Sequence, residues 1–163
     1  MTSGASHAPI RLARSYPVPA ERVWELWTTA AGIERWWAPE GFTVRVDSLD
    51  LRPGGDLRYT MTATAPEQVA FMRNAGLPLE TPSRKTFTEV TPATRLCYTT
   101  LADFVPDVAP YSFLTEVDLR PTAEGVDVTM KIEPMHDTEW TQRLVMGREN
   151  ELANLSQLVS STA

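Results

Sequence analysis

His136 is the side chain in this sequence best suited to acid–base chemistry. It stands directly before Asp137 and three residues before Glu139, where a stretch with helical spacing begins. A helix N-terminus disfavours the imidazolium form, so a neutral imidazole there can accept a proton or orient a ligand. The position equally suits a histidine that only hydrogen-bonds the start of the helix. No serine or cysteine nucleophile is paired with His136 by spacing, so we name no catalytic residue beyond this candidate.

Metal and thiol chemistry have little support in the sequence. The other histidine, His7, lies in a segment that we expect to be flexible, and no cluster of ligands has metal spacing. The single cysteine, Cys97, has no basic neighbour in sequence that would favour its thiolate, and we interpret it as a small buried residue. We therefore expect no metal and no cofactor.

Aromatic side chains form the second group of candidates. The segment RWWAPEGF places Trp36 and Trp37 side by side, and two adjacent indoles cannot point in the same direction. We expect one of them to anchor the core and the other to border a cavity, without a choice between them. Phe71 and Met72 suit a lid, or the apolar side of a surface helix. Other candidates for core or pocket wall are Tyr59, Met61, Tyr98, Phe113, Met130 and Trp140.

Length and charge limit the class of protein. The chain has 163 residues, the usual size of one domain, and we expect a flexible tail over residues 1–8 before a single domain over residues 9–160. The formal net charge is −6 and the 15 basic residues are scattered, which argues against nucleic-acid binding. No apolar run approaches about 20 residues, so we expect no membrane insertion. One cysteine and no secretory signal favour the cytoplasm.

Hydrophobic spacing predicts the elements that position these side chains. Apolar residues recur every three or four positions in a helix and every second position in a half-buried strand. We expect one strand, two short helices, about six further strands and one long helix. In chain order the expected ranges are 9–19 (strand), 20–31 and 33–37 (helices), 42–52 and 56–64 (hairpin), 65–82 (insertion with a short helix), 84–92 and 94–106 (hairpin), 110–121 and 125–134 (hairpin) and 137–160 (helix).

This order of elements predicts a pocket before any motif is considered. An antiparallel sheet with this many strands curls, and a helix of about 20 residues is long enough to lie across its concave face. A sheet wrapped around a helix leaves a volume that side chains need not fill, and such volumes are common ligand sites.

Several segments together resemble a known family. VWELWT, IERWWAPEGFT, LDLRPGGDLRYTM, FTEVTPATRLCYT and MHDTEWT are similar to segments of bacterial proteins related to the activator of heat-shock-protein-90 ATPase homologue, in the START/Bet v 1-like (SRPBCC, helix-grip) superfamily. The resemblance extends from about residue 10 to residue 160. It implies an α+β fold in which six or seven antiparallel strands grip the C-terminal helix, with a hydrophobic pocket between sheet and helix.

The resemblance implies no single activity, because its superfamily contains carriers, receptors and small enzymes. We expect binding of a hydrophobic or amphipathic small molecule, driven by apolar burial and oriented by polar groups such as Tyr59, Tyr98 and His136. Two alternatives stay open: a cyclase or hydrolase that uses His136, which we favour less, and an interaction module with a chaperone partner by family analogy. A homodimer is also compatible with the sequence.

One departure from the family pattern concerns the long helix. Members often carry Gly-Trp-Glu where this chain has GREN, residues 147–150, so Arg148 takes the place of an aromatic side chain. If that position faces the cavity, the pocket is more polar or of a different size.

Overall fold

The computed structural model describes residues 8–103 and 105–161. Most of the expected flexible tail, His7 included, lies outside the described residues. In chain order the elements are β1 (Ile10–Tyr16), α1 (Ala20–Thr28), α2 (Ala30–Ile33), β2 (Phe42–Leu49), β3 (Asp56–Ala63), α3 (Pro66–Asn74), β4 (Glu80–Thr91), β5 (Arg95–Ala102), β6 (Tyr111–Pro121), β7 (Val126–Ile132) and α4 (Thr138–Ser161).

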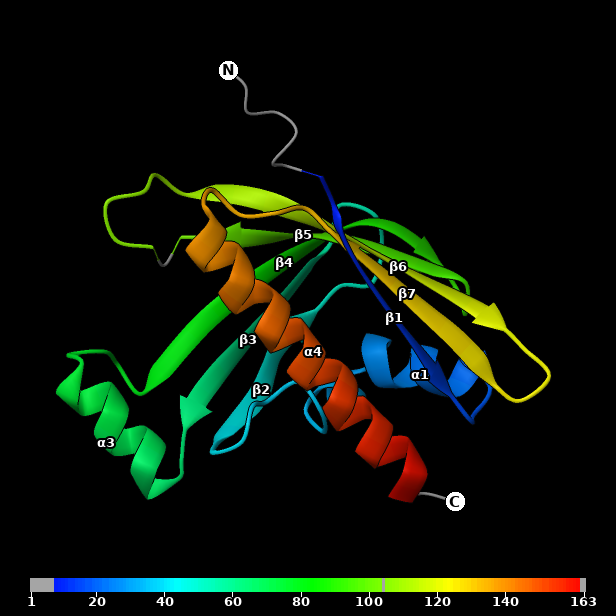
Figure 1. Cartoon of the computed structure of the whole chain (residues 1–163), viewed down its shortest axis with the longest axis horizontal. Coiled ribbons are helices and arrows are strands. Elements are labelled where there is room, and N and C mark those ends of the chain that lie inside the picture. Colours follow the sequence, from blue (N-terminus) through cyan, green and yellow to red (C-terminus); the bar gives the residue numbers. More distant parts are fainter. Residues whose placement is uncertain (1–7, 104, 162–163) are drawn as a thin grey trace.

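All seven strands belong to one antiparallel sheet in the order β1-β7-β6-β5-β4-β3-β2. Strands β2 to β7 follow one another as a meander, and β1 closes the sheet beside β7. The sheet curves, and α4 crosses its concave face from one end to the other (Figure 1). The predicted α+β helix-grip architecture is thereby confirmed. None of the described helices has the length and apolar character needed to cross a membrane.

The Pro-Gly-Gly turn between β2 and β3 uses the conformational freedom of glycine. Gly54 has a φ of +86°, a conformation in which a side chain is strained. Its amide donates to the Phe87 carbonyl at 2.8 Å, and the Phe87 amide donates to the Gly55 carbonyl at 2.9 Å. The turn is therefore fixed to β4 as well as to its own hairpin.

The insertion between β3 and β4 is shorter than predicted. Helix α3 ends at Asn74, and β4 begins at Glu80 because its first residues pair with β3, Thr81 opposite Met61. Figure 1 shows α3 at the end of the β3–β4 ribbon, apart from α4. No residue of α3 is buried, so this helix contributes little to the core.

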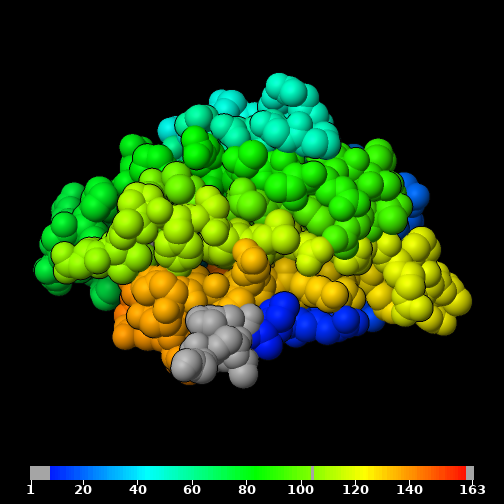
Figure 2. Space-filling model, turned by 90° about the horizontal axis from the view of Figure 1, so that it is seen from above, coloured from blue at the N-terminus to red at the C-terminus, as the bar shows by residue number. Residues whose placement is uncertain are grey.

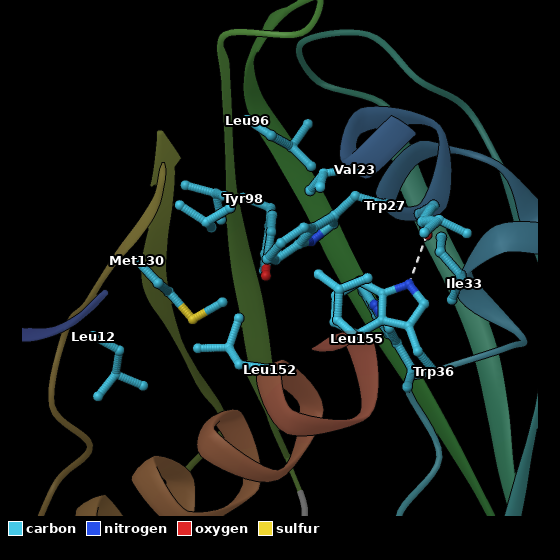
Figure 3. Close-up of a cluster of buried hydrophobic side chains, with 14 of the residues drawn as sticks. Leu12, Val23, Trp27, Ile33, Trp36, Leu96, Tyr98, Met130, Leu152 and Leu155 are labelled. Carbon is cyan, nitrogen blue, oxygen red and sulfur yellow. Dashed lines mark hydrogen bonds between the residues drawn. The ribbon is translucent and has the colours of Figure 1, made fainter. Parts of the chain in front are cut away.

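The core lies between the concave face of the sheet, α1 with α2, and the second half of α4. Leu152 and Leu155 of α4 reach the side chains of the sheet and of the α1–α2 segment (Figure 3). The largest fully buried side chains are Trp36, Tyr98, Phe87, Leu26, Ile33, Leu57, Leu96, Met130, Ile132, Leu152, Leu155 and Val23.

Helix α4 is packed unequally along its length. Asp137 caps it, since its Oδ1 accepts the Trp140 amide at 2.8 Å. The buried residues of α4 are Arg148, Leu152, Leu155 and Val159, so its first ten residues include none. The second half of the helix is a core element. The first half lies over the sheet, but none of its first ten side chains is fully buried against it.

Candidate functional site

A cavity of about 240 Å³ lies between the sheet and the first half of α4. It sits where the first half of the helix is not packed closely onto the sheet. The sheet and the helix each contribute both apolar and charged side chains to its lining. The lining residues are Tyr59, Ser83, Lys85, Thr100, Leu101, Phe113, Met135, Trp140, Arg143, Leu144 and Arg148.

Lys85 is the most unusual residue of this lining. It shares the concave face with Phe87, two positions along β4, and lies in a cross-strand row with Thr100 and Phe113. Only 2% of Lys85 is exposed. Its Nζ donates a hydrogen bond to Thr100 Oγ1 at 3.0 Å. A lysine side chain at a core position of a strand is thus held by one neutral hydroxyl.

Three aromatic rings surround the Lys85 amine. The distances from Nζ to the ring centroids are 5.5 Å for Trp37, 5.7 Å for Tyr59 and 5.3 Å for Tyr98. Faces of aromatic rings attract a cation at such distances, which offsets part of the cost of burying an ammonium group.

Burial lowers the pKa of Lys85 well below its ordinary value. The neighbouring Arg148 lowers this pKa further, while Glu151 acts in the opposite direction. The folded protein therefore releases the Lys85 proton much more readily than an exposed lysine does.

Arg148 brings a second cation to the cavity from α4. It is 8% exposed, and its Nη1 lies 2.8 Å from Glu151 Oε2, one turn along the helix. Its Nε is buried without a hydrogen-bond partner among the described residues. Arg148 stands on the same stripe as Leu152, Leu155 and Val159 and lines the cavity, so the GREN departure falls on a position that faces the cavity.

A third cation lies at the outer end of the cavity. Arg143 is exposed, stacks over the Trp140 ring at 4.7 Å from its centroid and pairs with Glu139 at 2.6 Å. The first turns of α4 reach the molecular surface (orange in Figure 2). The cavity thus runs from an exposed arginine to a buried lysine and arginine.

The two adjacent tryptophans have different surroundings. Trp36 is in the core: its Nε1 donates to the Leu26 carbonyl at 2.8 Å, and its ring meets Trp27 edge-on (Figure 3). Trp37 turns the other way, packs edge-on against Tyr59 with centroids 5.3 Å apart, and lies next to Lys85. Both indoles are therefore buried in the core, and Trp37, although it contacts Tyr59 and Lys85, is not among the lining residues of the cavity.

The other predicted site residues are divided between cavity, core and surface. Tyr59, Phe113 and Trp140 line the cavity, and Tyr98 borders it through Lys85. Met61 is half-buried against the core, and Met130 is fully buried within it. Phe71 and Met72 lie on α3, where 62% of Phe71 is exposed. Neither of these two is among the lining residues of the cavity.

His136 lies in a different place. It lines a separate surface hollow of about 370 Å³ with Asp137 and Thr141. The Tyr111 hydroxyl accepts the His136 amide at 3.0 Å and is 2.8 Å from Nδ1. The direction of the hydrogen bond between the hydroxyl and Nδ1 depends on the tautomer of the imidazole. His136 Nε2 lies 3.5 Å from Asp137, so the imidazole is held between its sequence neighbour and Tyr111 of β6.

Sequence reasoning missed Lys85 and Glu151. The signal for Lys85 was its spacing of two residues from Phe87 in a strand, since alternate residues share a face. The signal for Glu151 was its spacing of three residues from Arg148, which places the two side chains on one face of a helix. Among the described residues, no three His, Cys, Asp or Glu side chains gather closely enough to hold a metal ion.

Comparison with solved structures places this geometry in a group of similar folds. A protein from Chromobacterium violaceum is 25% identical, with a TM-score of 0.75 over 93% of this chain and 96% of that one. The AHSA1 protein from Silicibacter pomeroyi is 20% identical, with a TM-score of 0.74 over 96% of this chain and 100% of that one. A protein from Mycobacterium smegmatis is 18% identical, with a TM-score of 0.74 over 99% and 97% of the two chains.

Sequence comparison identifies the family. No curated protein matches the chain significantly. The model of the family described as activator of Hsp90 ATPase homolog 1-like protein matches residues 17–160. This range includes Trp36, Trp37, Lys85 and nearly all of α4. The chain belongs to the family of activator of Hsp90 ATPase homolog 1-like proteins.

Proposed function

We propose that this protein binds a small amphipathic molecule in the cavity between the sheet and the first half of α4. The observation that carries the proposal is the composition of that cavity. Phe113, Met135 and Leu144 supply apolar wall, while Lys85 and Arg148 supply buried polar groups at fixed positions. A concave apolar site with a few convergent polar groups is the usual form of a ligand pocket.

The size of the cavity limits the ligand. A volume of about 240 Å³ is below the roughly 300–1,000 Å³ of common ligand pockets. A molecule with one ring or a short chain fits this volume better than a long acyl chain does. Burial of about 150 Å² of apolar surface would contribute roughly 4 kcal/mol before the cost of ordering the ligand.

The two alternative functions have less support. His136 and the buried cations Lys85 and Arg148 are not on the same cavity, whereas an enzyme needs its polar groups to converge on one substrate. An interaction module has one observation in its favour, the exposure of Phe71 and Leu77 in and after α3. Two scattered apolar side chains make a small contact surface, and a chaperone partner rests on family analogy.

The test is a fragment screen with a blocked cavity as its control. Backbone amide and tryptophan indole NMR signals of the labelled protein report binding, and native mass spectrometry reports any small molecule that co-purifies. Leu144→Trp fills the cavity, and Met146→Trp adds the same side chain at an exposed position of the same helix. We expect fragments to shift signals around Lys85 in the wild type and in Met146→Trp but not in Leu144→Trp. Equal binding to all three proteins, or no binding fragment, would contradict the proposal.

A further inference from the structure

The lining of the cavity carries an excess of positive charge. Among the described residues that line it are Lys85, Arg143 and Arg148, and no Asp or Glu. Glu151 pairs with Arg148 but is not part of the lining. With Lys85 protonated, Lys85 and Arg148 carry two positive charges and Glu151 carries one negative charge. The three side chains together therefore have one excess positive charge.

The buried cations also lack acceptors. Lys85 Nζ has three hydrogen-bond donors when protonated, and it donates to the hydroxyl of Thr100. Arg148 uses Nη1 for Glu151, while its Nε has no partner among the described residues. Buried charged donors without acceptors are unfavourable, and an acceptor that arrives with a ligand removes this cost.

We propose that the ligand of this cavity is a small organic monoacid whose carboxylate is bound by Lys85 and Arg148, with its apolar part against Phe113, Met135 and Leu144. This inference rests on the proposed function and specifies its ligand class. The excess of one charge matches a carboxylate, which carries a single negative charge at neutral pH. A phosphate monoester carries nearly two, which one excess cation does not balance.

Binding of the acid is coupled to uptake of a proton. In the empty cavity, burial and Arg148 favour the neutral amine of Lys85. A carboxylate beside the amine favours the ammonium form, so the complex holds a proton that the empty protein lacks. The other titratable groups facing Lys85 are Tyr59 and Tyr98. Burial raises the pKa of Tyr59 to about 12 and that of Tyr98 further, so both stay neutral through the experimental range.

The experiment compares ligands that differ only in the charged group. Carboxylic acids with one phenyl ring or a chain of four to eight carbons are titrated into the protein in a calorimeter at pH 8. Each acid is compared with the alcohol that has the same apolar part. We expect the best acid to bind at least tenfold more tightly than its alcohol, since hydrogen bonds to charged groups contribute about 1.5–3 kcal/mol. Titration in buffers of different ionisation enthalpy should show a net proton uptake on binding of the acid and none for the alcohol.

Three variants locate the effect. Lys85→Met, and Arg148→Met combined with Glu151→Gln so that no unpaired carboxylate is buried, should each reduce the ratio of acid affinity to alcohol affinity at least tenfold. Lys85→Met should also abolish the proton uptake. Lys131→Met removes the other lysine of the chain, which is exposed on β7, and should bind both ligands as the wild type does.

The possible failures are distinguishable. If alcohols bind to the cavity and acids bind no more tightly, the acid inference is wrong while the proposed function stands. If acids bind more tightly but both variants keep that preference, the carboxylate is bound elsewhere and the inference is equally wrong. If neither the acids nor the alcohols bind, and the fragment screen also finds nothing, both the proposed function and this inference are wrong.

Discussion

Replacing Lys85 by Met should make the empty protein more stable. The amine is buried with one neutral hydrogen-bond acceptor, Thr100, and methionine has a similar length without the polar group. Burial lowers the pKa of this amine well below its ordinary value. Replacing buried charged groups by apolar side chains of similar volume is often neutral or stabilising by about 1–4 kcal/mol, with the lost polar contacts already included. We therefore expect Lys85→Met to raise the free energy of unfolding by about 1–4 kcal/mol.

The pH dependence has a definite sign. Because the pKa of Lys85 is lowered in the folded protein, the unfolded chain binds more protons between that lowered pKa and 10.5. Stability from this group therefore increases as the pH rises through this window, by up to about 1.4 kcal/mol per pH unit. The advantage of Lys85→Met over the wild type should accordingly shrink between pH 7 and pH 9.

Urea denaturation followed by tryptophan fluorescence at pH 7, 8 and 9 measures both effects. The exposed Lys131→Met serves as the control and should stay within about 0.5 kcal/mol of the wild type. A Lys85→Met protein that is less stable than the wild type by more than about 1 kcal/mol would refute the reasoning. So would identical changes of stability with pH in the two proteins, because the buried amine would then have no unusual titration.

Three further predictions concern the core and the thiol. Asn154→Ala should cost about 1–3 kcal/mol in urea denaturation, because Nδ2 donates to the Trp36 and Ala38 carbonyls at 3.1 Å each; no loss would mean that α4 does not hold this loop. Trp36→Phe should cost about 2–4 kcal/mol by calorimetric unfolding, because it vacates core volume and removes the donor to the Leu26 carbonyl; a neutral effect would contradict its role as anchor. Burial raises the pKa of Cys97 to about 11, so a disulfide reagent at pH 8 should label it far more slowly in native than in urea-unfolded protein; equal rates would contradict its burial.

The fold could be predicted almost entirely from local patterns. Alternation in residues 126–132 and the turn residues around Gly54 depend on neighbours in sequence, and both elements are where they were expected. The ends of elements were less predictable. Strand β4 begins four residues early because its first residues pair with β3, and that pairing is a tertiary contact.

The charged part of the cavity was harder to predict. Lys85 stands among polar residues in SRKTFTEV, and only the pairing of β4 with both β3 and β5 makes its face the inside of a curved sheet. His136 shows the opposite problem. Its neighbours in sequence suggested a polar group at the cavity rim, but Tyr111 of β6 contacts its Nδ1 on a separate surface hollow. Both outcomes depend on residues far away in the chain.

The unequal packing of α4 separates the residues that shape the cavity from the residues that stabilise the fold. In a small protein the same residues usually serve both purposes. Substitutions that reshape the cavity fall at Trp140, Arg143 and Leu144, none of which is fully buried, whereas the leucines that hold the fold begin at Leu152. The shape of the cavity can therefore change by mutation at a small cost in stability. One helix of this scaffold is a natural starting point for engineering, since its first half can be varied while its second half preserves the fold.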